Sequence, residues 1–166
     1  GIALTTAVKG SITLEGANVS VFGDLKAPGG NLSFLAYNIS PGVAEALRLS
    51  TGAVLPAPNA GRGSFTLGAR SSLSAAGQII DYRPGGNTPF NVPVVNDGGR
   101  VSIKSYSASL AAGSEIDVSG GVVAGVRGGY TYGRAGTIEI LTGRDLSLPA
   151  VDRGSLHLGS TLKGFS

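Results

Sequence analysis

A short phrase recurs six times along this chain: a glycine, one polar residue, and then three residues of which the first and third are apolar. The copies begin at Gly10, Gly30, Gly63, Gly99, Gly136 and Gly154. Alternation of apolar and polar residues predicts a strand with one buried face, and the glycine predicts a turn before it. A fixed pattern that returns every 20 to 40 residues or so is typical of solenoid proteins.

Composition agrees with an all-β chain. The 166 residues include 28 glycines, yet 42% of the residues are hydrophobic, which argues against disorder. The apolar residues are mainly Val, Ile, Leu and Ala, as in short strands joined by many turns. Since the chain has no cysteine, disulfides, thiolate metal sites and cysteine nucleophiles are excluded.

The apolar residues of the six phrases predict the core. If successive coils stack, these residues form one ladder with a spacing of about 4.8 Å. Its members are Ile12, Leu14, Leu32, Phe34, Phe65, Leu67, Val101, Ile103, Ile138, Ile140, Leu156 and Leu158. The expected fold is therefore a parallel β-helix of about five to six coils.

We expect residues 1–166 to form a single segment of this helix, excised from a longer solenoid because neither end resembles a polar cap. Insertions interrupt the coils near residues 40–46, 87–97 and 122–135. In the first, Ser40 and Pro41 suit the N-cap and first position of a helical turn.

The third insertion is the candidate binding loop. Its glycine-rich sequence presents two tyrosines and two arginines, and both residue types are enriched in binding hot spots. These residues are Arg127, Tyr130, Tyr132 and Arg134. The alternative is a loop that only covers the corner of a coil.

A second candidate site consists of carboxylates. Glu115 and Asp117 lie two residues apart and so share one face of a strand, and Asp81 is expected at the matching position of the preceding coil. Stacked carboxylates could catalyse glycoside chemistry or bind a hard cation such as Ca²⁺. The simpler alternative is an aspartate that stabilises a turn through backbone amides. No motif for a cofactor is present, and the basic residues are scattered rather than gathered into a nucleic-acid-binding stripe.

Residues 110–121, Leu-Ala-Ala-Gly-Ser-Glu-Ile-Asp-Val-Ser-Gly-Gly, followed by Gly136-Thr-Ile-Glu-Ile140, resemble the coil repeat of filamentous haemagglutinin-like exoproteins. These are large bacterial adhesins of two-partner secretion systems. The resemblance extends from about Gly10 to Leu158, although only residues 110–121 carry the full phrase. It implies a right-handed β-helix, export through an outer-membrane partner transporter, and location outside a Gram-negative cell.

The expected function is therefore a structural, non-catalytic shaft segment of a secreted or cell-surface adhesin. Its partners would be neighbouring coils of the parent chain and a host receptor or glycan that contacts the loops. The alternatives are a carbohydrate-binding or polysaccharide-cleaving β-helix, and a module whose open ends associate with other copies of itself.

Overall fold

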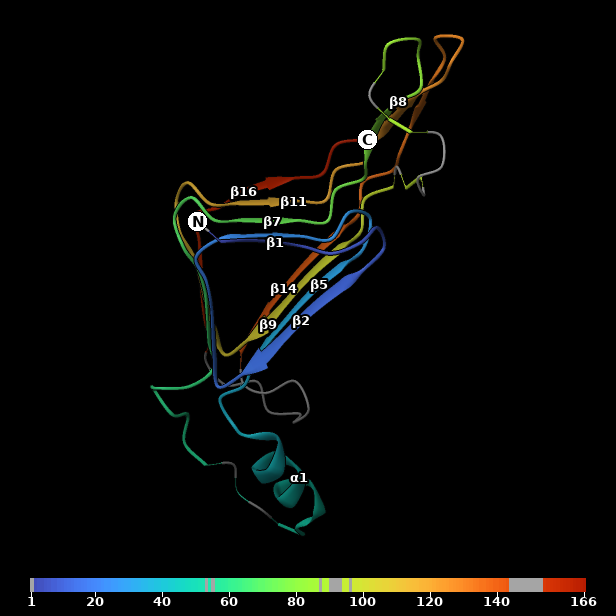
Figure 1. Cartoon of the computed structure of the whole chain (residues 1–166). Helices are drawn as coiled ribbons and strands as arrows, with labels where there is room; N and C mark the ends of the chain where they lie inside the picture. The colour runs from blue at the N-terminus through green and yellow to red at the C-terminus, as the bar shows by residue number, and fades with distance from the viewer. Residues whose placement is uncertain are drawn as a thin grey trace.

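The computed structural model describes residues 2–52, 54, 56–86, 88–89, 94–95, 97–143 and 154–166. The protein is mostly β, and nearly all of its strands pair in parallel. Three sheets form the sides of a triangular stack, which Figure 1 views roughly along its length. This parallel architecture agrees with the prediction from the recurring phrase.

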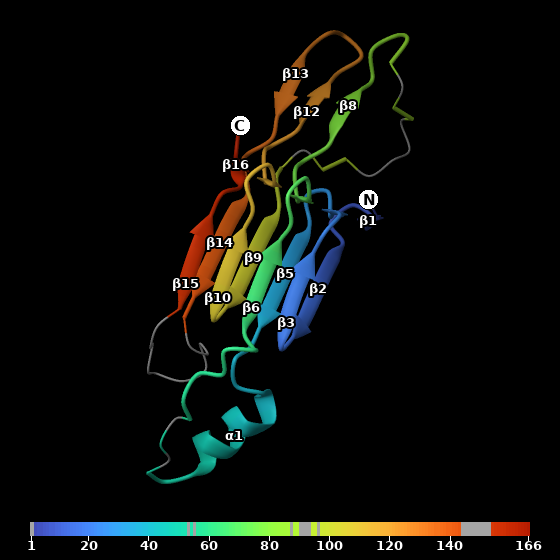
Figure 2. The ribbon, with the colours of Figure 1, turned by 90° about the vertical axis from the view of Figure 1, so that its left-hand side faces the viewer.

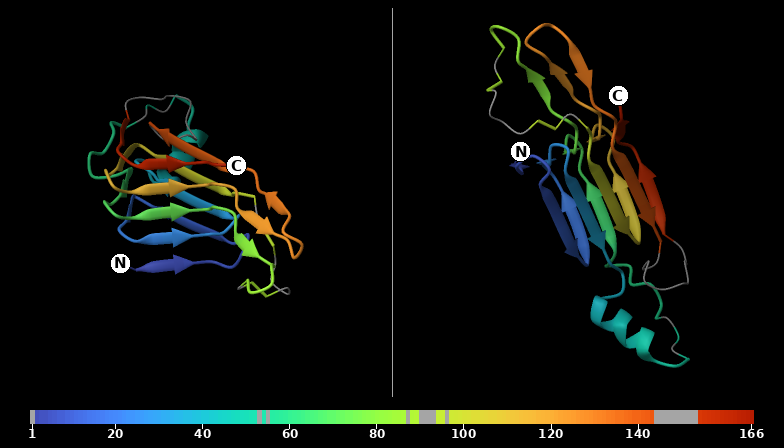
Figure 3. Two further views of the ribbon diagram at one scale, coloured as in Figure 1. Left: turned by 90° about the horizontal axis from the view of Figure 1, so that it is seen from above. Right: turned by 90° about the vertical axis from the view of Figure 1, so that its right-hand side faces the viewer.

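The three sheets of the stack are named here sheets A, B and C. Sheet A contains, in spatial order, β1 (Ala3–Thr5), β4 (Asp24–Lys26), β7 (Ser72–Ser74), β11 (Glu115–Asp117) and β16 (Thr161–Lys163). Sheet B contains β2 (Ser11–Gly16), β5 (Asn31–Ala36), β9 (Arg100–Ser105) and β14 (Thr137–Thr142). Sheet C contains β3 (Asn18–Val21), β6 (Ser64–Leu67), β10 (Ser107–Leu110) and β15 (Ser155–Leu158). Figure 3, left, shows the strands of sheet A side by side in chain order.

After β1, the chain visits sheets B, C and A in the same order each time. The described residues make this pass four times, as β2–β3–β4, β5–β6–β7, β9–β10–β11 and β14–β15–β16. The described residues thus make four passes and the single strand β1, where the sequence predicted about five to six coils. The reason is that two of the six glycine-led phrases form strands of sheet C rather than coils of their own.

The predicted single ladder is wrong, because its residues divide between two sheets. Sheet B aligns Ile12, Leu32, Val101 and Ile138 in one column, and Leu14, Phe34, Ile103 and Ile140 in the next. Phe65 and Leu67 belong instead to sheet C, where they pair with Ala108 and Leu110, and through these with Leu156 and Leu158. Sheet A adds one column of Leu4, Leu25, Leu73, Ile116 and Leu162.

The columns of all three sheets meet in one apolar core. Phe34 of sheet B packs against Phe65 of sheet C, with ring centroids 5.2 Å apart. Leu73 of sheet A is fully buried in the same cluster. Burial decreases toward both ends of the stack: Leu14 is 38% exposed at one end and Leu158 is 49% exposed at the other. Each pass therefore depends on its neighbours for burial of its apolar side chains.

Four glycines form a further column at the corner between sheets A and B, namely Gly10, Gly30, Gly99 and Gly136. A Cβ on any of the last three would overlap the backbone carbonyl oxygen of the preceding member of the column. None of the four has a positive φ. Close approach of successive turns, rather than an unusual backbone conformation, therefore requires glycine at the start of these phrases.

The insertions leave the stack at its corners. The helix α1 (Pro41–Leu49) projects from the corner between sheets B and C (Figures 1 and 2). The expected start of this helix is confirmed: Ser40 is the N-cap in an extended conformation, and Pro41 occupies the first helical position. The helix extends beyond the predicted turn to Leu49, with an ion pair between Glu45 and Arg48.

The base of this insertion is closed by Asn38, whose side chain is almost fully buried. Its Nδ2 donates to the carbonyl oxygens of Asn59, at 2.7 Å, and of Arg62, at 2.8 Å. Its Oδ1 accepts a hydrogen bond from the backbone N–H of Asn59, at 2.9 Å. One amide side chain therefore joins the point where the chain leaves sheet B to the point where it returns.

We expect Asn38→Ala to lower the free energy of unfolding by about 2 kcal/mol, since three hydrogen bonds between the buried amide and the backbone are lost. Asn31→Ala is the matched control, because Asn31 lies on the exposed side of β5, and its effect should stay within about 0.5 kcal/mol. Urea denaturation followed by circular dichroism measures both. Equal effects of the two substitutions would contradict the role assigned to Asn38.

Candidate functional site

A small sheet projects from the corner between sheets A and B and is called here the fin (Figures 1 and 2). It consists of β8 (Ile79–Asp81), β12 (Val122–Ala124) and β13 (Tyr130–Tyr132). The central strand β12 pairs in parallel with β8 and antiparallel with β13. The predicted glycine-rich loop at 122–135 is therefore a β-hairpin.

Cross-strand pairing determines which side chains share a face of the fin. Ile79, Val122 and Tyr132 form one row, and Asp81, Ala124 and Tyr130 form the second row on the same face. Ile79 is 83% exposed and Tyr132 is 69% exposed, although the side chain of Ile79 is apolar and that of Tyr132 is largely so. This face therefore presents the combination of aliphatic and aromatic side chains that is common at binding surfaces.

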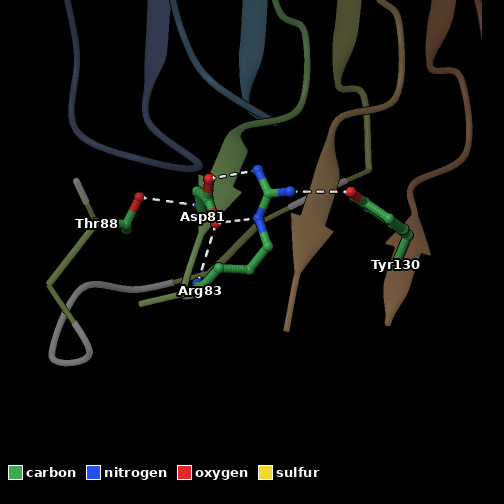
Figure 4. A network of polar contacts seen from close by, with 4 residues as sticks. All are labelled: Asp81, Arg83, Thr88 and Tyr130. Carbon is green, nitrogen blue, oxygen red and sulfur yellow. Dashed lines mark hydrogen bonds and ion pairs between the residues drawn. The ribbon is translucent and has the colours of Figure 1, made fainter. Parts of the chain in front are cut away.

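Arg83 crosses this face and joins the two outer strands (Figure 4). Its Nε and Nη2 donate to the two carboxylate oxygens of Asp81 at 2.9 and 2.7 Å. Its Nη1 donates to the hydroxyl of Tyr130 at 3.1 Å, and the guanidinium lies 5.8 Å from the centroid of the Tyr130 ring. Because the guanidinium is planar and has donors on several sides, it can hold both residues in fixed positions.

The backbone supports this arrangement. The N–H of Arg83 donates to Asp81 Oδ1 at 3.0 Å, and the N–H of Asp81 donates to the Thr88 hydroxyl at 3.1 Å (Figure 4). The Tyr130 and Tyr132 rings lie nearly parallel, with an interplanar angle of 24° and centroids 6.4 Å apart. The tyrosine pair is therefore held in place before any ligand arrives, which lowers the entropy cost of binding.

Hydrogen bonds from Arg83 lower the pKa of Asp81 to about 2, and the pKa of Arg83 is raised in turn. In an unfolded chain an aspartate titrates near 3.9. Because the folded pKa is the lower one, this ion pair stabilises the fold above about pH 4. Its contribution disappears as the pH falls from about 4 to about 2.

Titration of the Asp81 carboxyl carbon by NMR should thus give a midpoint near pH 2. Arg83→Gln should return the midpoint toward about 4, because the carboxylate loses its charged donor. In Tyr130→Phe the midpoint should stay low, since the tyrosine hydroxyl bonds only to the arginine in this network. An ordinary midpoint in the wild-type protein would mean that the ion pair does not form in solution.

The structure brings together only part of the predicted binding loop. Tyr130 and Tyr132 lie side by side, whereas Arg127 is exposed in the turn between β12 and β13. Arg134 follows β13, and its backbone N–H donates to Asp97 at 2.8 Å. Sequence reasoning missed Arg83, which contacts Tyr130 across 47 residues, and Ile79. The turn sequence around Arg83 contains no signal for this contact, because it depends on how β8 and β12 pair.

The predicted carboxylate cluster is wrong in its third member. Glu115 and Asp117 share a face of β11, but their partners in β7 are Ser72 and Ser74. Asp81 lies in the fin, where it is paired with Arg83. The insertion between β7 and β9 displaced it from the column that the sequence predicted. Within the described residues, no group of three or more carboxylate or imidazole side chains could hold a metal ion.

Glu115 is also engaged by a cation. The ammonium of Lys163 on β16 lies 2.6 Å from Glu115 Oε2, and this contact raises the pKa of Lys163. Lys26 lies in the same column as Asp117 and Lys163, with Ser74 between it and Asp117. The outer face of sheet A thus carries mixed charges, of which Lys163 and Glu115 are in contact, and exposed pairs of this kind are typical of a solvated surface.

Of the 87–97 insertion, predicted as an extended loop or protruding edge, the structure describes only residues 88–89, 94–95 and 97. Here Val95 exchanges hydrogen bonds with Gln78, at the start of the fin.

In the described residues, no helix has the length and apolar character needed to cross a membrane. Comparison of the chain with models of known protein families, with curated proteins and with solved structures gives no match.

Proposed function

We propose that this protein is a right-handed parallel β-helix segment that serves as the non-catalytic shaft of a large secreted or cell-surface bacterial adhesin. The observation that carries the proposal is the repeated order of strands in sheets B, C and A, with in-register columns of apolar residues. Connections between parallel strands are right-handed in nearly all proteins, which supports the proposed hand. A stack of this kind is a rigid spacer, since every pass is fixed by its neighbours.

The ends of the stack support the role of a shaft segment. Leu4 is 51% exposed at one end, and Leu156 is 46% exposed at the other. The strand edges there also lack a pairing partner among the described strands. Further windings of the same kind would cover both the apolar side chains and the open backbone groups.

The insertions support a role in display. The fin and α1 project from different corners of the triangle, so that neither interrupts the columns of the core (Figure 2). One outer row of sheet C consists of small polar residues, namely Asn18, Ser64, Ser107 and Ser155. Contact with a host receptor or glycan is therefore assigned to the fin, whose exposed tyrosines stand out from this polar surface. The resemblance to haemagglutinin-like exoproteins supports export through an outer-membrane partner.

Adhesion of coated beads tests the proposal. Beads carrying the wild-type chain should attach to cultured epithelial cells, and Tyr130→Ala with Tyr132→Ala should reduce attachment about tenfold, since two anchor residues are lost. Glu115→Gln with Asp117→Asn is the control and should leave attachment unchanged. Absence of attachment by the wild-type beads would contradict the display function.

The same control variant tests the alternative of polysaccharide cleavage. A glycoside hydrolase needs a pair of carboxyl groups with different roles, and here Glu115 is bound by Lys163 while Asp81 lies in another sheet. The alternative of carbohydrate binding is favoured by the tyrosine pair beside the Asp81–Arg83 ion pair. Polysaccharide turnover by the wild type that is lost in Glu115→Gln with Asp117→Asn would overturn the non-catalytic proposal.

A further inference from the structure

The fin has one open edge, which is formed by β13. Within the described part of the chain, β13 has β12 on one side and no strand on the other. The hydrogen bonds that flank the pairing of β12 and β13 run from the Gly125 N–H to the Gly129 carbonyl, at 2.7 Å, and from the Gly133 N–H to the Gly121 carbonyl, at 2.9 Å. These bonds determine which backbone groups of β13 face outward.

Antiparallel pairs alternate between those that exchange hydrogen bonds and those that do not. Since the pairs 125/129 and 121/133 are of the bonded type, Thr131 directs its N–H and C=O toward Val123. Tyr130 and Tyr132 consequently belong to the pairs that exchange no hydrogen bonds with β12, and their N–H and C=O groups point away from it. On the opposite side of β12 the same alternation holds, because the Val122 N–H donates to Gln78 and the Ala124 carbonyl accepts from Tyr82.

The open edge also carries its own anchors. The side chains of Tyr130 and Tyr132 are 53% and 69% exposed and lie nearly parallel to each other. Arg83 holds Tyr130 by its hydroxyl, so the edge is preorganised (Figure 4). Proteins usually protect such edges with lysine, proline, a bulge or an inward-pointing charge. The sequence Tyr-Thr-Tyr of β13 contains no lysine, no proline and no charged residue.

We infer that the open edge of β13 accepts an extended polypeptide strand of a partner protein, which adds to the fin as a fourth strand. This inference rests on the proposed display function and names the class of partner that the fin binds. Two donors and two acceptors that alternate at the two-residue spacing of a strand, about 6.8 Å, match the backbone of an extended peptide. Tyr130 and Tyr132 would contact apolar or β-branched side chains on one face of the added strand.

A pair of substitutions at one position isolates the backbone contribution. Tyr132→Ala removes the aromatic side chain and keeps the outward N–H, whereas Tyr132→Pro removes both. Proline is tolerated on an edge strand when its missing N–H would face solvent. The inner ladder, through Thr131, should survive in both variants, and protection of the Thr131 amide from hydrogen exchange reports whether the hairpin is intact.

The probe is a display library of random twelve-residue peptides, selected on the immobilised wild-type chain. Selected peptides should slow exchange of the Tyr130 and Tyr132 amides, and Tyr132→Pro should weaken their binding at least about tenfold beyond the effect of Tyr132→Ala. Failure to select any peptide, or equal binding by the two variants with an intact Thr131 bond, would overturn the inference. Bead adhesion that persists in Tyr132→Pro would then show that the display function holds while the partner is not a strand. If beads carrying the wild-type chain do not attach at all, the display function itself is contradicted.

Discussion

Replacing Gly99 by alanine should give one of the two largest losses of stability in this protein, about 3 kcal/mol or more. A Cβ at this position would overlap the carbonyl oxygen of Gly30 and approach its backbone nitrogen. These obstacles are backbone atoms of the neighbouring turn, so no side-chain rotation relieves the overlap. Because Gly99 lies between Gly30 and Gly136 in the corner column, a shift to accommodate the methyl group would separate the passes of the stack.

Gly129→Ala is the matched control. A Cβ at Gly129 would meet no atom within 4 Å, and Gly129 does not have a positive φ. Its effect should stay within about 0.5 kcal/mol. Thermal and urea unfolding of both variants measures the difference, and a Gly99→Ala protein as stable as the wild type would show that the turns are not in such close contact.

Phe34→Ala is the second substitution with a large expected effect, about 4 kcal/mol. Phe34 is 1% exposed and packs against Phe65, so its removal leaves a cavity where sheets B and C meet. Contacts with both sheets also limit how far the surroundings can collapse into the cavity.

Leu14→Ala serves as the control because Leu14 occupies the same column as Phe34 in the adjacent strand. At 38% exposure on the end of the stack, it should cost only about 1 kcal/mol. The free energies of unfolding should therefore differ by several kcal/mol between two positions of one column. Similar losses would contradict the assignment of Phe34 to the interior and Leu14 to the end.

Local features of the fold could be predicted from the sequence, because they depend on residues close together in the chain. Alternation in Gly136-Thr-Ile-Glu-Ile140 is sufficient to predict a strand with Ile138 and Ile140 on one face, and these residues pack against the core cluster. Ser40 followed by Pro41 is likewise sufficient for the start of α1.

The alignment of strands between passes was predicted incorrectly, because it depends on the length of each insertion. Phe65 and Val101 occupy the same position of the recurring phrase, yet Phe65 lies in sheet C after the helical insertion, and Val101 lies in sheet B. The reason for glycine at the corners also could not be predicted from the local sequence. The sequence predicts a turn at each of them, whereas close approach between successive turns accounts for the glycine column, and only the assembled stack reveals it.

Only part of the candidate site could be predicted, because the rest depends on how distant strands pair. The exposure of Tyr130 and Tyr132 follows from their place in a polar, glycine-rich insertion. Their link to Asp81 through Arg83 joins two separate insertions, which meet only because β8 and β12 pair in parallel. Sequence reasoning instead placed Asp81 in the column of Asp117, since it could not assign β8 to a sheet outside the stack.

Engineered disulfides can probe the alignment of strands between passes, because the chain has no cysteine of its own. Thr66 and Ser109 are paired across β6 and β10, so Thr66→Cys with Ser109→Cys places the two Cα atoms within the range that a disulfide can bridge. Thr66→Cys with Ser102→Cys tests the alignment that the recurring phrase alone suggests. From the observed alignment we expect rapid oxidation of the first pair and none of the second, as measured by mass spectrometry of proteolytic fragments. A disulfide between positions 66 and 102, with none between 66 and 109, would contradict it.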